Sequence, residues 1–275
     1  MEKRKPPRII IALVAFFAIF TILSVIGFAV PWRSEVASEE GQGIDAVITY
    51  LLFATGALVI VGHAILIRFL LKGRDDQTTA YVRPPAKVEW MWGVIPVIVM
   101  MLLAEAGVLV VGSATWDKLY AETPTNPVVL EVVGKQFEWL IRYPGKDNTY
   151  GAYDFKWVNG ADNPMGIDED DDAAMDDIIS RGTMYLPRGR TAQIRLRTHD
   201  VIHSFFVPDF RVKQDVIPGF PTEIRFTPTV NGVYELVCTE LCGLGHYKMR
   251  GTVHVVDPED YEAWLNKRPT FGGED

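Results

Sequence analysis

The stretch C-T-E-L-C-G-L-G-H-Y-K-M, from Cys238 to Met249, holds the only two cysteines of this 275-residue chain. His246 follows the second cysteine by four residues, and Met249 follows His246 by three. Thiolate, imidazole and thioether groups at such close spacing are typical of a metal site, and the sulfur ligands favour copper or zinc. Such a site needs a rigid scaffold around its loop, so the flanking sequence is considered next.

The sequence around this loop is typical of short β-strands. From Pro127 onward, β-branched and aromatic residues occur in runs separated by Gly, Pro and Asn, which favours strands joined by turns. About 140 residues of this kind predict a β-sandwich. The tail PEDYEAWLNKR predicts a short helix that begins at Pro258. The strand-like runs are VVLEVVGKQFEWLIRY, TAQIRLRT, TEIRFTP, GVYELV and RGTVHVV.

The first part of the chain carries most of the apolar excess of a sequence that is 48% hydrophobic. Three runs are long enough to cross roughly 30 Å of hydrocarbon as helices that rise about 1.5 Å per residue. They are Ile9–Val30, Val47–Leu71 and Trp92–Ala114. The first run has a second interpretation as a cleaved signal peptide, with Gly27-Phe28-Ala29 as its cleavage site, and the sequence leaves the two open.

Loop charges predict the orientation of these segments. The leader MEKRKPPR is basic, and so on balance is LKGRDDQTTAYVRPPAK, whereas RSEVASEEGQGID between the first two segments is mainly acidic. Since basic loops stay on the inner face, we expect the domain after about residue 116 to lie outside. Glu105 lies within the third segment, where an acid marks a functional position, and Glu89 lies at its inner mouth.

One acidic stretch interrupts the strand pattern. Residues 159–180 carry eight acids and no Lys or Arg, which equals the net charge of −8 for the whole chain. We expect either a solvated surface insertion or a field that steers a basic partner protein. The negative charge argues against nucleic acid as a partner, because phosphate binding needs a basic surface.

The twelve-residue loop needs a further ligand from elsewhere in the chain. His203 is the candidate, because it lies at the end of a strand-like run in THDVIHSFFVP. Two Cys and two His would satisfy one structural zinc ion. Met249 adds a thioether that zinc rarely uses and copper accepts, so the donor set favours a pair of coppers that share both sulfurs. A single zinc that staples the loop is the alternative.

These residues resemble the cytochrome c oxidase subunit 2 family. The loop is similar to its binuclear copper (CuA) motif, HSFFVPDFRVKQDVIPG to its upstream segment, and KVEWMWGVIP to its Glu-Trp-Pro helix start. The resemblance implies N-terminal transmembrane helices, two or three in number, followed by an all-β, cupredoxin-like Greek-key sandwich. It implies that the backbone carbonyl of Glu240 is one copper ligand. The other implied ligands are the side chains of His203, Cys238, Cys242, His246 and Met249.

The resemblance also implies roles for other residues. The Glu240 side chain would bind an interface magnesium or manganese ion, and Glu89 would stand at the entrance of a proton path into subunit 1. Electron acceptance and donor docking would involve Phe137, which replaces the family's exposed Trp, together with Trp139 and Asp200. Arg142 stands where some relatives carry a docking acid.

The function implied is that of an oxidoreductase subunit that accepts electrons from cytochrome c at two copper ions. It would pass them to haem in subunit 1, which reduces oxygen and pumps protons, with subunit 3 as a further partner in a bacterial or archaeal plasma membrane. A nitric oxide reductase subunit and a zinc-stapled interaction module are the alternatives. The implied organisation is an extra helix or signal in 1–30, a helical hairpin in 31–116, the copper domain in 117–257 with insertion 159–180, and a C-terminal helix and tail in 258–275.

Overall fold

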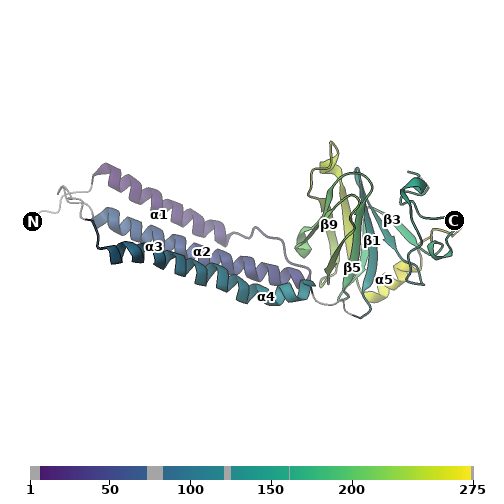
Figure 1. The fold of residues 1–275 in the computed structure, drawn as a ribbon, viewed down its shortest axis with the longest axis horizontal. Coiled ribbons are helices and arrows are strands. Elements are labelled where there is room, and N and C mark those ends of the chain that lie inside the picture. The colour runs from purple at the N-terminus through teal and green to yellow at the C-terminus, as the bar shows by residue number, and fades with distance from the viewer. Residues whose placement is uncertain (1–6, 73–82, 121–124, 161, 274–275) are drawn as a thin grey trace, which may run out of the picture. The chain divides into compact units, whose positions relative to one another are not determined.

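The computed structural model describes residues 7–72, 83–120, 125–160 and 162–273, and they form two compact units (Figure 1). One unit lies within residues 1–34 and 45–114 and is helical, and the other lies within residues 35–44 and 115–275 and is mainly β-structure. Most of the basic leader, and most of the basic loop after Leu71, fall outside the described residues.

The described chain contains three helices that are long and apolar enough to cross a membrane. The second and third extend past the predicted apolar runs, because helical hydrogen bonding continues into the polar residues at their ends. The predicted fold class, transmembrane helices followed by a β-sandwich, is therefore confirmed with three helices. They are α1 (Arg8–Ala29), α2 (Glu39–Lys72) and a third span made of α3 (Ala86–Met100), the π-helix η1 (Met101–Ala106) and α4 (Gly107–Tyr120).

A polar contact joins α1 to α2 within the apolar unit. The Thr21 hydroxyl donates to the Phe17 carbonyl at 2.8 Å and lies 2.8 Å from Nδ1 of His63. The His63 ring also packs against the rings of Phe17 and Phe20. His63 is therefore a hydrogen-bonded packing residue between the two helices.

The third span widens into a π-helix around Glu105. Such a widening leaves main-chain carbonyls free, and the Tyr50 hydroxyl on α2 donates to the carbonyl of Leu103. Gly107 permits this approach, because a Cβ there would collide with the Tyr50 ring. The Glu105 side chain itself is exposed in the isolated chain.

The β-unit is a sandwich of two five-stranded sheets (Figure 1). Neighbouring strands are antiparallel except for the parallel pairs β1–β5 and β4–β10. The first sheet has the order β3 (Ile178–Arg181), β2 (Glu138–Tyr143), β1 (Val128–Lys135), β5 (Ala192–Thr198), β8 (Thr222–Phe226). The second has the order β4 (Thr183–Pro187), β10 (Arg250–Val256), β9 (Gly232–Cys238), β6 (His203–Val207), β7 (Val212–Val216).

The core lies between the two sheets and is built from alternating aliphatic and aromatic residues of both, such as Leu130, Ile194, Phe205 and Leu236. β3 and β4 are nearly continuous, and Gly182 between them has a positive φ of 66° that suits glycine. The chain thereby passes from one sheet to the other. The predicted C-terminal helix is α5 (Pro258–Leu265), which packs against β4.

The segment that follows α1 is part of the sandwich unit. Ser38 donates its hydroxyl to the Phe210 carbonyl at 2.8 Å, and the Glu40 carboxylate accepts the Thr227 N–H at 2.9 Å. Ser38 is completely buried, and Glu40 is 7% exposed. Residues 35–44 are thus built into the sandwich rather than forming a loose connection between two helices.

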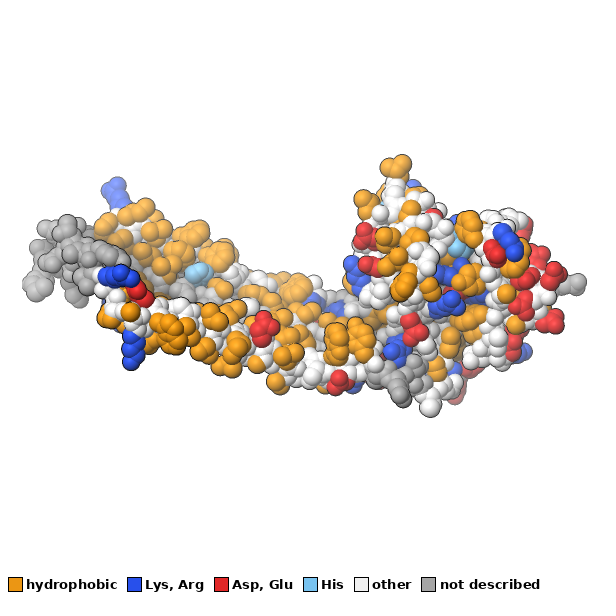
Figure 2. Space-filling view, viewed as in Figure 1, with side chains coloured by type: hydrophobic (Ala, Val, Ile, Leu, Met, Phe, Trp, Pro, Cys, Tyr) orange, Lys and Arg blue, Asp and Glu red, His pale blue; other side chains and the backbone are white. Residues whose placement is uncertain are grey.

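The acidic insertion is packed, which corrects the expectation of a solvated segment. Met165, Ile167 and Ala174 are fully buried and form a second small core with Val133 and Leu140 on the outer face of the first sheet. Several of its acids accept backbone hydrogen bonds. Asp176, for example, accepts the Lys146 N–H at 2.6 Å. Other acids are exposed, and Figure 2 shows acidic side chains gathered at one side of the sandwich unit.

Candidate metal centre

Adjacent strands of the second sheet bring two distant parts of the sequence together. His203 is the first residue of β6, and Cys238 is the last residue of β9. The strands run antiparallel with Phe205 opposite Cys238, so the start of one and the end of the other meet at the same end of the sandwich. The structure places His203 beside the cysteine loop in this way.

The nitrogen and sulfur atoms of four side chains face one another. The two Sγ atoms of Cys238 and Cys242 are 3.9 Å apart. Nδ1 of His203 lies 3.8 Å from Sγ of Cys238, and Nδ1 of His246 lies 3.5 Å from Sγ of Cys242. Both cysteines are free thiols and buried. The ligand atoms of His203, Cys238 and Cys242 lie within 4.8 Å of one another, which is close enough to hold a metal ion.

Two softer or weaker donors complete the cluster. Sδ of Met249 lies 3.8 Å from Sγ of Cys242, and the thioether side chain is 1% exposed. The backbone carbonyl of Glu240 lies 3.2 Å from Sγ of Cys238. The structure therefore gathers all six donors that the sequence singled out at one end of the second sheet.

The loop that carries these donors is held by its own backbone. The N–H of His246 donates to the Gly243 carbonyl at 3.1 Å, the N–H of Lys248 donates to the Gly245 carbonyl at 2.8 Å, and the short helix η5 (His246–Lys248) follows. Gly243 has a φ of 133°, which favours glycine. The turn directs His246 back toward Cys242.

The two thiols have different acidities. Burial acts to raise the pKa of Cys238, but hydrogen bonds from His203 and the backbone of Ser204 outweigh it and lower the pKa to about 6. Burial and the neighbouring charge of Cys238 raise the pKa of Cys242 to about 11. Near neutral pH the first thiolate is available in the free chain, and the second would lose its proton on metal binding.

The two aromatic residues assigned to electron acceptance lie at different depths. Phe137 is 37% exposed, and its ring lies against the backbone of Gly243 and Gly245 in the donor loop. Trp139 is fully buried, with its ring centroid 6.0 Å from that of His203. Phe137 is therefore available to a docked protein, whereas any part that Trp139 plays is internal.

The predicted acidic site residues occupy three different settings. The Glu240 side chain is exposed beside the donor loop. Asp200 is adjacent to His203, with its Oδ1 2.8 Å from Nε2 of that ring. Glu89 lies in the first turn of α3, where it pairs with Arg83 at 3.3 Å. Arg142, for which the family resemblance implied a docking position, is completely buried and so is not part of a docking surface.

Sequence reasoning missed Gln136 and the apolar rim of the loop. The Gln136 side chain donates from Nε2 to the Cys242 carbonyl at 2.6 Å, a contact that its place in a turn between two strands does not predict. Leu241 is 80% exposed, Leu244 99% and Tyr247 69%. Their apolar character within a solvent-facing loop was the available signal for a protein-contact surface.

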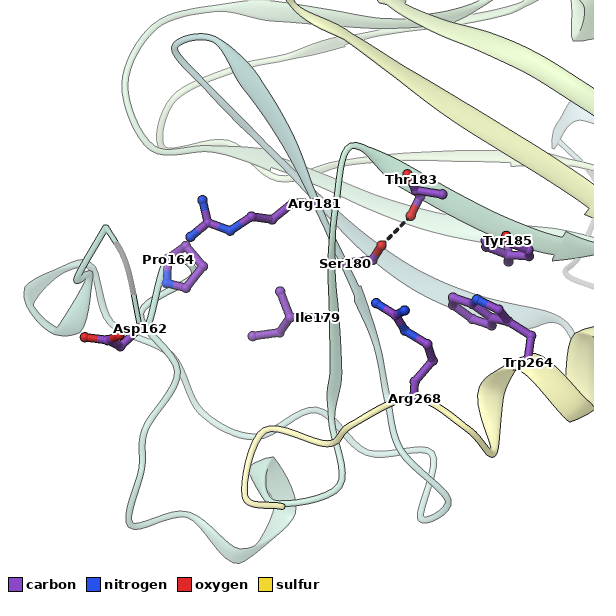
Figure 3. Close-up of a pocket in the computed structure, with 9 residues that line it drawn as sticks. All are labelled: Asp162, Pro164, Ile179, Ser180, Arg181, Thr183, Tyr185, Trp264 and Arg268. Atoms are coloured by element: carbon purple, nitrogen blue, oxygen red, sulfur yellow. Dashed lines mark hydrogen bonds between the residues drawn. The ribbon is translucent and has the colours of Figure 1, made fainter. Parts of the chain in front are cut away.

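The sandwich unit also contains a groove that is separate from the sulfur cluster. It is a groove of about 550 Å³ beside β3, β4 and α5 (Figure 3). Arg181 and Arg268 line it together with Tyr185 and Trp264, whose rings stack at 4.3 Å. The donor residues of the loop do not line this groove.

Comparisons with known proteins match this chain to one family. The family described as "Cytochrome C oxidase subunit II, periplasmic domain" matches residues 128–256. An alternative cytochrome c oxidase subunit 2 from Bradyrhizobium diazoefficiens is 34% identical over 246 residues, which are 88% of this chain and 86% of the relative.

Two further relatives match over shorter regions. A cytochrome c oxidase subunit 2 from Thermostichus vulcanus is 39% identical over 137 residues, or 50% of this chain and 32% of the relative. The crystal structure of the periplasmic domain of subunit II of a Bradyrhizobium japonicum cytochrome oxidase is 25% identical. It covers 52% of this chain and 94% of that domain, with a TM-score of 0.38.

Proposed function

Because this chain belongs to the cytochrome c oxidase subunit II family, we propose that it is the electron-accepting subunit of its haem–copper oxidase. In this proposal it takes single electrons from cytochrome c at a binuclear copper centre and delivers them to haem in subunit 1. Reduction of oxygen to water and proton pumping take place in that partner, with subunit 3 as a further component.

The observation that supports copper most directly is the geometry of the donors. Two thiolates that share a metal at about 2.3 Å each lie no more than about 4.6 Å apart, and the two sulfurs here are 3.9 Å apart. An imidazole Nδ1 faces each thiol from opposite ends of the pair. The donor set of two sulfurs, two nitrogens, one thioether and one carbonyl is larger than one tetrahedral ion needs, and it suits two soft ions.

Bound copper would supply one-electron transfer without bond making. The chain contributes a buried and already assembled set of ligands, because Cys238, Cys242, Met249 and His203 are each less than 9% exposed. Strand ends fix Cys238 and His203, and the hydrogen-bonded turn fixes His246. Such a set needs little rearrangement when its charge changes, which favours fast electron transfer.

The remaining predicted roles fit where their residues lie. The exposed carboxylate of Glu240 is free to bind a magnesium or manganese ion at the contact with subunit 1. Glu89 stands in the first turn of α3, beside the predicted inner face, as the entrance of a proton path. The sandwich unit would face the periplasm of a bacterium, or the outside of an archaeon.

The test is copper binding by the purified full chain in detergent. We expect two coppers per chain, strong visible thiolate–copper absorption and an electron paramagnetic resonance spectrum with hyperfine coupling to two copper nuclei. A colourless chain that binds one zinc ion would contradict the proposal and support the zinc-stapled module. Met249→Leu separates these two as well, since it should shift the potential of a copper site and leave a zinc staple intact.

A nitric oxide reductase subunit is the second candidate, since it would use the same donors. Copper binding alone does not separate it from an oxidase. The two are separated by measuring which gas is consumed by membranes that contain the assembled complex. We expect oxygen consumption.

A further inference from the structure

Two polar contacts join α1 and its C-terminal extension to α2, and a groove lies between them. At its deep end, the Thr21 hydroxyl lies 2.8 Å from Nδ1 of His63. At its other end, just after α1, Nη2 of Arg33 donates to Oγ1 of Thr49 at 3.1 Å. The groove between these contacts has a volume of about 490 Å³, which lies within the usual range of small-molecule sites, about 300–1,000 Å³.

The walls of the groove are apolar along one stripe of each helix. Val25 and Phe28 line it from α1, and Leu52, Gly56 and Ile60 line it from α2. Residues three and four positions apart lie on the same face of a helix, so each stripe is continuous. Gly56 leaves the space open, because the nearest atom to an added Cβ is Cε2 of Phe28 at 3.9 Å.

The length of the groove matches one leaflet of a bilayer. From Thr49 to Ile60, α2 advances by 11 residues, which is about 16 Å at a rise of 1.5 Å per residue. The hydrocarbon core of a bilayer is about 30 Å thick, so one leaflet contributes about 15 Å. Both helices are long and apolar enough to cross a membrane, where no water is present to fill an apolar groove. The groove therefore suits one acyl chain of a lipid.

The end of the groove near Arg33 has the character of a headgroup site. Trp32 also lines it, and indole rings are enriched where the hydrocarbon meets the headgroups. The Arg33 guanidinium lies 5.2 Å from the centre of the Trp32 ring, and Nη1 lies 3.5 Å from Oδ1 of Asp45. A guanidinium has five N–H donors, so donors remain for a phosphate after the bond to Thr49. The adjacent carboxylate suits a headgroup that also carries a cation.

We propose that the α1–α2 groove binds one phospholipid with a zwitterionic headgroup of the phosphatidylethanolamine type. One acyl chain lies over Gly56, the phosphate accepts hydrogen bonds from Arg33, and the ammonium group lies beside Asp45. Because α1 forms one wall, this helix has a function of its own in holding the lipid. The proposal does not rest on the proposed copper function, since the site lies in the helical unit and uses none of the metal donors.

The first test measures lipid binding to the purified full chain in detergent by native mass spectrometry. We expect one phosphatidylethanolamine per wild-type chain, and lower occupancy when phosphatidylglycerol, which carries no cation, is added at the same concentration. Gly56→Leu fills the groove and should weaken phosphatidylethanolamine binding by roughly 5- to 150-fold. Gly62→Leu is the matched control on α2, because an added Cβ there meets no atom within 4 Å and Gly62 does not line the groove.

Equal lipid occupancy in the wild type and in Gly56→Leu would show a non-specific lipid shell and overturn the proposal. A preference for phosphatidylglycerol would overturn the pairing of the ammonium group with Asp45. A mature N-terminus close to Ala29 would remove one wall of the groove, and the site with it. None of these results bears on copper binding, so failure of this proposal and failure of the proposed function are distinguishable.

The second test examines the headgroup without filling the groove. Arg33→Gln keeps the apolar walls and removes the charged donor, so phosphatidylethanolamine should bind roughly tenfold more weakly or worse. Binding of diacylglycerol, which has the same chains and no phosphate, should be unchanged by this variant. If Arg33→Gln binds phosphatidylethanolamine as tightly as the wild type, the phosphate is not held by Arg33. In the assembled complex, a photo-crosslinker in place of Phe53 should react with lipid, and a crosslink to a second subunit would overturn the proposal in favour of a protein occupant.

Discussion

Arg142 donates from Nε to Oδ2 of Asp177 at 2.9 Å, and both side chains are completely buried. The pair joins the C-terminal end of β2 to the end of the acidic insertion, 35 residues later in the chain. Oε2 of Glu131 lies 3.7 Å from Nη1 of Arg142, and Oε1 of Glu131 accepts a 2.8 Å hydrogen bond from Nε of Arg197. Four charges thus form a cluster between the first sheet and the insertion.

This cluster predicts that Arg142→Met destabilises the sandwich unit. Removing one partner leaves buried charge without compensation, which costs about 3–5 kcal/mol of unfolding free energy. The double variant Arg142→Met with Asp177→Leu should recover part of the loss, because it removes both charges. Denaturant unfolding of the full chain in detergent measures this.

The exposed pair Arg188–Asp257 provides the control for that measurement. Its atoms are 2.6 Å apart, but each side chain is 48% exposed, so Arg188→Met should cost no more than about 1 kcal/mol. Equal losses for Arg142→Met and Arg188→Met would contradict the importance of the buried cluster.

His199 predicts a pH dependence of stability. Burial, with the neighbouring charges of Arg197 and Lys135, lowers its pKa to about 4 from an ordinary 6.5. As the pH falls below 6.5 the unfolded chain gains a proton that the folded chain does not accept until about pH 4. The wild type should therefore lose stability over this range relative to His199→Gln. Thermal midpoints of both chains between pH 4 and 7 test this, and parallel curves would rule it out.

The raised pKa of Asp177 acts in the opposite direction within the wild type. Burial raises it to about 6 from an ordinary 3.8, despite the hydrogen bonds from Arg142. The raised pKa of Asp177 therefore weakens the fold as the pH rises from about 4 to 6. Because it is common to the wild type and to His199→Gln, the difference between the two curves isolates the histidine.

The sequence was sufficient for the fold class and for the donors in the loop, because both depend on local pattern. Apolar runs indicate membrane helices, and the Cys, His and Met spacing is contained in twelve residues. The position of His203 followed from its place at a strand end. In contrast, buried and exposed residues do not alternate along the strand E-W-L-I-R-Y. Five of the six residues in this strand are buried, because the insertion covers its outer face.

The insertion that covers β2 explains why Arg142 is buried, although the family resemblance implied a docking position for it. Its burial depends on a segment that lies far along the chain, and no local pattern indicates such a cover. The π-helix around Glu105 and the bond from Gln136 to Cys242 were also beyond prediction. Each depends on which side chain of another element meets the backbone.

The contact between α1 and α2 predicts that α1 stays in the mature chain. Without α1, His63 would lose the Thr21 hydroxyl and two aromatic neighbours in an apolar surrounding. Intact mass of the purified protein should therefore include residues 9–30. A mature N-terminus close to Ala29 would show that the first segment is a signal peptide.

The strength of the same contact is measured by Thr21→Val. Hydrogen bonds between membrane helices contribute about 0.6 kcal/mol on average and at most about 2 kcal/mol, so a small decrease in resistance to unfolding by dodecyl sulfate is expected. Ser24→Ala is the control, because Ser24 bonds within α1 to the Phe20 carbonyl. If Thr21→Val and Ser24→Ala behave alike, the interhelical bond does not stabilise the unit.

Gly245 and Phe137 provide the last prediction, because they test whether the shape of the donor loop controls metal binding. A Cβ at Gly245 would lie 2.4 Å from the Phe137 ring, and overpacking of this kind costs about 1–3 kcal/mol. Gly245→Ala should therefore weaken copper binding by roughly 5- to 150-fold, as the loop shifts His246 away from Cys242. Gly160→Ala, where the added methyl meets no atom within 4 Å, should leave the affinity unchanged. The double variant Gly245→Ala with Phe137→Ala removes the collision and should regain most of the affinity in a competition titration with a chelator. If the double variant binds copper as weakly as Gly245→Ala alone, the collision is not the cause, and Phe137 does not shape the loop.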